Sequence, residues 1–178
     1  MPSGVSFSNQ HIEISDYADH FNDVSDSLKD FFDPLGPKYV VRWVMMTPPE
    51  VTSRFNNRLS EFELTSSLAL MTGIEALFRI DYANRVGQRL RDPLSKAFRA
   101  LHKKHQTKVS LEDQILDLWR DHTNVNRQDV SSLKSAFKYR HWLAHGRYWT
   151  PKLGRQYRYR DIHNLAVAVR TGFPFILD

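Results

Sequence analysis

Several kinds of functional site are excluded by what this chain lacks. Cysteine is absent from its 178 residues, so neither a disulfide nor a zinc site with cysteine ligands can form. Glycine occurs only seven times and never in a phosphate-binding loop, which argues against a dinucleotide-binding fold. No G-x-S-x-G nucleophile elbow is present either, so a serine hydrolase triad has no support.

Long hydrophobic runs are also missing. The longest, residues 68–78, contains Glu75 and is too short to span a bilayer. The beginning of the sequence lacks the basic and apolar pattern of a signal peptide. With 41% hydrophobic and 25% charged residues, the composition is that of a soluble protein the size of one domain. We therefore expect a cytoplasmic protein with no membrane segment.

Acidic residues are absent from residues 138–160, which hold seven lysines and arginines with six aromatic residues between them. Cations that neutralise phosphates, together with aromatic faces that stack on bases, suit single-stranded or looped RNA. The alternative is a solvated basic surface with its aromatic residues in the core. The candidate RNA-binding residues are Lys138, Arg147, Tyr148, Trp149, Arg155 and Arg158.

The opposite charge dominates the beginning of the chain. Residues 1–37 contain seven acidic residues against one lysine, a net charge of −6, so the remaining residues carry +11. The acidic segment could cover the basic stretch and regulate whatever that stretch binds.

Helical periodicity predicts an all-α fold in two parts. Residues 1–47 form an acidic N-terminal extension with one helix over residues 16–32 and a possible short strand at residues 39–46. Residues 48–178 form a helical domain. Its predicted helices are a short one from Pro48, a long one over 61–86 that follows a capping box at Ser60, and further helices over 92–104, 110–122, 129–145 and 161–172.

The stretch F-K-Y-R-H-W-L-A-H-G-R-Y-W, residues 137–149, is the most informative part of the sequence. Arg140 lies within an apolar helical stripe, where a charge is unfavourable unless it is paired. Glu75 has the equivalent position in the long helix, so we expect the two side chains to meet. The alternative is an ion pair that serves packing alone. The stripe consists of Val130, Leu133, Ala136, Phe137, Leu143 and Ala144.

His141 and His145 share one face of the predicted helix, and Gly146 follows where helices often end in a left-handed turn. Imidazole suits acid–base catalysis near neutral pH, and a guanidinium suits phosphate oxygens. The catalytic candidates are His145 as general acid/base, His141 as a second acid/base or orienting group, Arg140 as phosphate clamp, and Glu75 as its partner.

The same two histidines have the spacing of helical zinc ligands. A zincin would however need glutamate at the position of Trp142, and no third ligand clusters nearby in the sequence. We predict that the site uses no metal and no other cofactor.

Arg140-His141-x-x-x-His145 resembles the R-x4-6-H motif of the HEPN family, in which a polar residue commonly follows the arginine. The resemblance covers about residues 48–172. It implies a HEPN-like helical bundle of about five helices, here with an N-terminal extension. Many HEPN proteins are metal-independent ribonucleases that act as toxins or in defence against phage, and two copies commonly join their motifs.

The resemblance therefore implies a metal-independent endoribonuclease, a toxin or antiphage-defence effector, that leaves 2′,3′-cyclic phosphate ends. It also implies a homodimer along the motif helix and an inhibitor or antitoxin protein as a further partner. The alternative is a non-catalytic HEPN-like module that binds RNA, a nucleotide or a partner protein.

Overall fold

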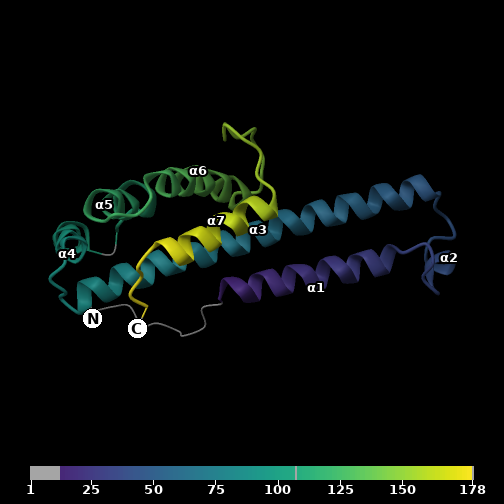
Figure 1. The fold of residues 1–178 in the computed structure, drawn as a ribbon. Coiled ribbons are helices and arrows are strands. Elements are labelled where there is room, and N and C mark those ends of the chain that lie inside the picture. The colour runs from purple at the N-terminus through teal and green to yellow at the C-terminus, as the bar shows by residue number, and fades with distance from the viewer. Residues whose placement is uncertain (1–12, 107, 178) are drawn as a thin grey trace.

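The computed structural model describes residues 13–106 and 108–177, and within these ranges every regular element is helical (Figure 1). The predicted all-α class is confirmed for this part of the chain, while residues 1–12 of the predicted extension lie outside it. Seven α-helices and one π-helical turn are present in the described ranges, against about five helices predicted for the bundle. They are α1 (Ile14–Phe32), α2 (Tyr39–Arg42), α3 (Pro48–Gly87), α4 (Pro93–His105), the π-helical turn η1 (Leu111–Ile115), α5 (Leu116–His122), α6 (Arg127–Ala144) and α7 (Tyr159–Gly172).

The central element is α3, a single helix of 40 residues where two helices were predicted. Thr47 begins it as expected, because its backbone N–H and its hydroxyl both donate to the carboxylate of Glu50, at 2.7 and 2.8 Å. Ser60, the second predicted start, lies inside the helix. No glycine or proline interrupts residues 50–72, so nothing in this stretch ends the helix, which extends for roughly 60 Å.

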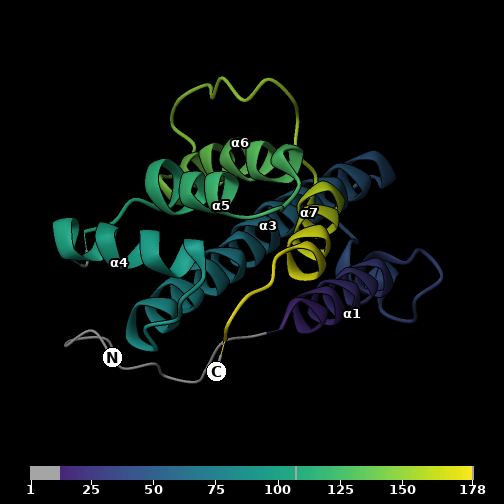
Figure 2. The same cartoon turned by 60° about the vertical axis from the view of Figure 1, so that its left-hand side comes forward.

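The other helices use different parts of this long axis. Helices α4, α6 and α7 pack against α3, with α5 joining α4 and α6, while α1 runs back along α3 as the other half of a hairpin (Figures 1 and 2). The far end of the hairpin, with α2, projects beyond the bundle (Figure 1). Apolar side chains from α3 to α7 fill the core, among them the fully buried Leu70, Met71, Ile74, Phe78, Phe98, Trp119 and Ile162.

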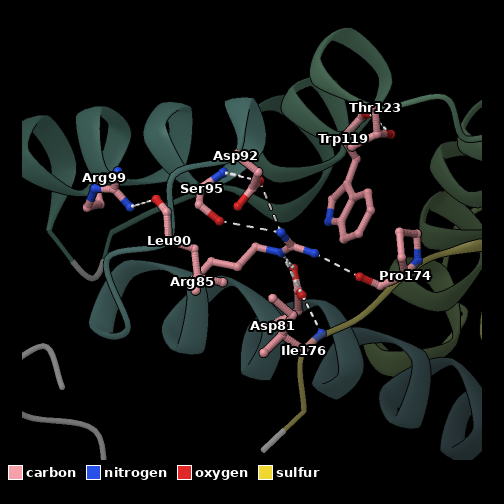
Figure 3. Close-up of polar contacts among 10 residues, drawn as sticks. All are labelled: Asp81, Arg85, Leu90, Asp92, Ser95, Arg99, Trp119, Thr123, Pro174 and Ile176. Carbon is pink, nitrogen blue, oxygen red and sulfur yellow. Dashed lines mark hydrogen bonds and ion pairs between the residues drawn. The ribbon is translucent and has the colours of Figure 1, made fainter.

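A buried ionic cluster closes the end of the core (Figure 3). Arg85 donates through Nε to both oxygens of Asp81, at 2.8 and 3.0 Å, and through Nη1 to Asp92 at 3.2 Å. Its remaining nitrogen donates to the carbonyl of Pro174 at 2.7 Å, and Asp81 also accepts the N–H of Ile176 at 2.8 Å. These bonds hold the C-terminal segment across α3, a contact that helical periodicity does not predict.

The predicted strand at residues 39–46 is wrong. Tyr39–Arg42 is a short helix, and the residues that follow form a turn. A strand needs a second strand to accept and donate its backbone hydrogen bonds, and the described residues offer none. Burial of Trp43, which stacks on Phe32 with ring centroids 4.9 Å apart, decides the local conformation instead.

The acidic helix α1 contacts the bundle through its apolar face. Phe21 stacks on Tyr159 at 3.7 Å, and the Tyr159 hydroxyl donates to the carbonyl of Tyr17 at 3.1 Å. Within the described ranges, no carboxylate of residues 13–37 forms an ion pair with residues 138–160. Residues 13–37 therefore contact the basic stretch at Tyr159 through stacking and one hydrogen bond, without an ion pair to it. None of the described helices has the length and apolar character needed to cross a membrane.

Candidate active site

The end of α6 is held in a defined turn. Gly146 and Arg147 both have left-handed backbone conformations, with φ of 76° and 58°. The N–H of Gly146 donates to the carbonyl of Leu143 at 3.4 Å, and the N–H of Arg147 donates to that of Trp142 at 3.2 Å. These two bonds are the Schellman motif, which satisfies carbonyls at a helix end, and they confirm the predicted role of Gly146. His145 is the capping residue, directly after the last helical residue.

The two motif histidines lie together on the surface at this helix end. The ring centroids of His141 and His145 are 4.3 Å apart, and both side chains are exposed. The indole of Trp149 lies beside them, with its centroid 6.0 Å from that of His141. Trp149 is held there because its carbonyl accepts the indole N–H of Trp142 at 2.7 Å. The loop after α6 thus returns to the histidine pair.

Arg140 and Glu75 form the expected ion pair, with Nη2 of the arginine 3.2 Å from a carboxylate oxygen. The other oxygen of Glu75 accepts from Nε and Nη2 of Arg79, at 3.3 and 3.2 Å. One carboxylate therefore neutralises only half the charge of two guanidinium groups. The pair is less buried than the sequence led us to expect, because 31% of the Arg140 side chain and 24% of Glu75 are exposed.

Four residues of the predicted apolar stripe of α6 are fully or almost fully buried, and Leu143 is buried as well. Ala144 is the exception, since it is exposed at the end of the helix. Its place in the stripe was predicted wrongly, because the turn at Gly146 ends α6 before Ala144 reaches the core. The four are Val130, Leu133, Ala136 and Phe137.

The predicted RNA-binding residues differ in how free they are to bind. Tyr148 is 84% exposed, and Lys138 and Arg158 also lie on the surface. Arg147 and Arg155 are already paired. Arg147 donates to both oxygens of Glu61 at 2.8 Å each, whereas Arg155 lies 3.3 Å from Asp161 and over the ring of Tyr157.

Several aromatic residues of the basic stretch belong to the core, as the alternative interpretation of the sequence proposed. Tyr139 and Tyr159 are buried. Tyr139 stacks on Tyr157 at 5.1 Å and on Trp142 at 5.9 Å. Only part of the aromatic surface counted from the sequence is therefore available to stack on bases, with Tyr148 the most exposed member.

Two carboxylates near the site were missed by sequence reasoning. Glu61 is the first residue of the predicted helix over 61–86, and its hydrogen bonds from Arg147 lower the pKa of its carboxyl. Glu112 lies in η1, where burial raises the pKa of its carboxyl. The charges of His141 and Lys138 oppose that rise, so both lie within electrostatic reach of Glu112. No local sequence pattern predicts the contact between Glu61 and Arg147 or the approach of Glu112 to His141 and Lys138.

No set of three histidine, aspartate or glutamate side chains suited to hold a metal ion was found in residues 13–106 and 108–177. No family model, no curated protein and no solved structure matches this chain. The resemblance to HEPN proteins therefore rests on residues 140–145 and on the helical character of the chain around them.

Proposed function

We propose that this protein is a metal-independent endoribonuclease whose active site is the C-terminal end of α6. The observation that carries the proposal is the exposed pair of imidazoles, His141 and His145, with ring centroids 4.3 Å apart directly after Arg140. Two groups that can each donate or accept a proton, with a guanidinium adjacent to them in the sequence, provide the chemical groups that RNA transesterification needs.

The chemistry follows from these roles. One imidazole, in its neutral form, takes the proton of a ribose 2′-hydroxyl as that oxygen attacks the adjacent phosphorus. The other, in its protonated form, gives a proton to the departing 5′-oxygen. The phosphorus–oxygen bond to the next nucleotide breaks, which leaves a 2′,3′-cyclic phosphate and a free 5′-hydroxyl. Arg140 stabilises the negative charge that accumulates on the phosphate oxygens in between.

We assign the general acid/base role to His145, because the Schellman turn fixes its backbone while its side chain stays exposed. His141, on the helix itself, is the second acid/base or the group that orients His145. Glu75 and Arg79 determine where the Arg140 guanidinium lies, since Arg140 and Arg79 both bind the carboxylate of Glu75.

The substrate of this proposed enzyme is single-stranded or looped RNA. Tyr148 offers an exposed ring for stacking, and Lys138 and Arg158 offer cations for phosphates. Arg147 and Arg155 contribute less than their charge suggests, because carboxylates already bind them. From the HEPN resemblance we further propose a toxin or defence role, an inhibitor protein, and a homodimer along α6.

The second candidate is a non-catalytic HEPN-like module that binds RNA, a nucleotide or a partner protein. The ion pair of Arg140 favours it, because a guanidinium engaged by Glu75 serves packing without any catalysis. The two candidates differ in what happens to RNA after binding.

The decisive experiment incubates the purified protein with a labelled single-stranded RNA in excess chelator and analyses the product ends. We expect cleavage with 2′,3′-cyclic phosphate and 5′-hydroxyl ends. His145→Ala should lower the rate by about 10²-fold or more, with a change in stability below about 0.5 kcal/mol. His122→Ala is the matched control, since His122 is exposed at the end of α5 and should be active. Binding without cleavage in the wild type would establish the non-catalytic module instead.

A further inference from the structure

The far end of the α1–α3 hairpin, which projects beyond the bundle in Figure 1, carries exposed apolar side chains that the proposed ribonuclease does not use. We call residues 35–45 the tip. Five of its apolar side chains are between 72% and 92% exposed: Leu35, Val40, Val41, Val44 and Met45. Soluble monomers rarely expose contiguous apolar patches without a binding role. The small core beneath the tip, made of Phe32, Trp43 and Val51, leaves these side chains outside.

An apolar groove lies next to the tip, between α1 and the first part of α3. It has a volume of about 720 Å³, within the range of roughly 300–1,000 Å³ that is usual for binding pockets. Helices α1 and α3 form its walls, and its apolar lining comes from both helices and from the turn before α3: Val24, Leu28, Met46 and Phe62. The groove spans residues 46–62, so it is roughly 20 Å long at the rise of an α-helix.

The groove also carries two arginines without a carboxylate partner. Arg54 and Arg58 line it, and neither forms an ion pair within the described residues. The two nearby glutamates are engaged elsewhere, Glu50 with Thr47 and Glu61 with Arg147.

Unpaired charges of the opposite sign lie on α1. Three exposed carboxylates of this helix form no ion pair in the described part of the chain: Asp19, Asp23 and Asp30. The arm formed by residues 19–62 therefore carries the apolar tip, an apolar groove, and arginines and carboxylates that have no ion pair within the described residues. Of these arginines, Arg54 lies over the ring of Trp43.

We propose that this arm pairs with the same arm of a second copy of the chain, in antiparallel orientation. The tip of each copy then enters the groove of the other, and the carboxylates of α1 approach Arg54 and Arg58 across the interface. With a two-fold axis between the copies, each tip fills the groove of the other copy at the same time, as isologous interfaces require. Two helical hairpins joined in this way form a four-helix bundle, in which each hairpin buries the face that it exposes alone.

A membrane is the competing occupant of the tip, and the charges argue against it. Residues 26–54 contain four acidic and four basic residues, so the region has no net charge to attract anionic lipid. The arm interface is also distinct from the dimer along α6 that the HEPN resemblance implies, because the tip and α6 lie at different ends of the molecule (Figure 1).

Cross-linking tests the pairing directly, because the chain has no cysteine and every introduced thiol is therefore unique. Met45→Cys places a thiol on the tip, and Asn57→Cys places one in the groove. We expect a mixture of the two variants to form a disulfide between copies under mild oxidation, while neither variant alone does so efficiently. Efficient self-cross-linking of Met45→Cys would mean that the tips meet each other, which would overturn the antiparallel arrangement. Absence of any cross-link would overturn the interface.

Charge placed on the tip provides the second measurement. Val41→Asp with Val44→Asp should weaken self-association at least about tenfold in Kd by sedimentation, since both side chains lose an apolar environment. Val167→Asp on α7 is the matched control, because Val167 is also exposed and lies outside the tip and the residues that line the groove. Equal self-association of the tip variant and the wild type would contradict the proposal. Sedimentation of the wild type with neutral lipid vesicles, lost in the tip variant, would assign the tip to a membrane instead.

Val41 and Val44 are both at least 72% exposed, so the tip variant should fold, which circular dichroism checks. Neither measurement depends on RNA cleavage. A failed cleavage assay therefore leaves the arm proposal standing, and a failed cross-link leaves the ribonuclease proposal standing.

Discussion

The guanidinium of Arg147 binds both carboxylate oxygens of Glu61, with nitrogen–oxygen distances of 2.8 Å. This bond joins the turn after α6 to the middle of α3. Arg147 has a φ of 58°, a left-handed conformation that non-glycine residues seldom adopt, so a tertiary contact is needed to favour it. The turn in question carries His145, and Glu61 is in this way a positioning residue for the proposed catalytic group.

Glu61→Gln should therefore lower the rate of RNA cleavage while the protein remains folded. Misplacement of a reacting group by about 1 Å can lower a rate by about 10²-fold, and we expect a smaller loss than for His145→Ala. Reversal of the pair, Glu61→Arg with Arg147→Glu, should restore part of the rate. Glu63→Gln is the control on the same helix, because Glu63 has no ion pair in the described residues. Identical rates for Glu61→Gln and the wild type would remove Glu61 from the site.

The pair of Arg140 and Glu75 separates catalysis from stability. Arg140→Ala should abolish cleavage and lower the free energy of unfolding by roughly 1–3 kcal/mol, between the values typical of exposed and of fully buried ion pairs. The loss is smaller than for a fully buried pair, since both side chains are partly exposed and Glu75 keeps Arg79 as a partner. Arg140→Met with Glu75→Met should regain stability without regaining activity.

Arg79→Met is the matched variant for this series, because it removes the other arginine of Glu75 and leaves Arg140 paired. Cleavage by Arg79→Met should continue. Denaturant unfolding and the RNA assay on these three variants test the expectations together. A fully active Arg140→Ala protein would show that the guanidinium serves packing alone.

The salt dependence of RNA binding should distinguish free cations from paired ones. Each phosphate contact to a single strand contributes about 0.7 to the slope of log K against log salt concentration. Arg158→Gln should reduce the slope by about that amount, because Arg158 is exposed at the start of α7. Arg155→Gln should change it less, since Arg155 is paired with Asp161. Equal effects of the two substitutions, measured by fluorescence anisotropy, would mean that RNA displaces Asp161.

The buried cluster around Asp81 predicts an unusual pH dependence of stability. Burial raises the pKa of Asp81 from 3.8 to about 6. Between these values the folded protein holds a proton that the unfolded chain has released, so stability decreases as pH rises from about 4 to about 6. The shift corresponds to about 3 kcal/mol. Carboxylates with lowered pKa, such as Glu61 and Asp92, act in the opposite sense and only as pH falls towards and below about 4.

Asp81→Asn removes the titrating group and keeps its shape. Its unfolding free energy should therefore change less than that of the wild type between pH 4 and pH 6. Urea unfolding at several pH values measures the difference. The same pH dependence in both proteins would locate the titration elsewhere.

Local patterns in the chain were sufficient to find most helices and the turn that ends α6. The helix starts at Thr47 and Asp92 and the left-handed turn at Gly146 depend on hydrogen bonds between residues at most five apart, so the residues concerned are close in the sequence. The ion pair of Arg140 and Glu75 was also predictable, because each charge interrupts an apolar stripe and two such stripes face one another across a helical interface.

The continuity of α3, the conformation of residues 39–46 and the partners of Arg147 and Asp81 depended on tertiary packing. The capping-box sequence at Ser60 is compatible both with a helix that begins there and with a helix that continues through it. A β-branched run becomes a strand only if another strand is available to pair with it. Glu61 lies 86 positions before Arg147, and Asp81 lies 95 positions before Ile176. Such meetings depend on which helices pack together, and packing is a property of all the apolar faces at once.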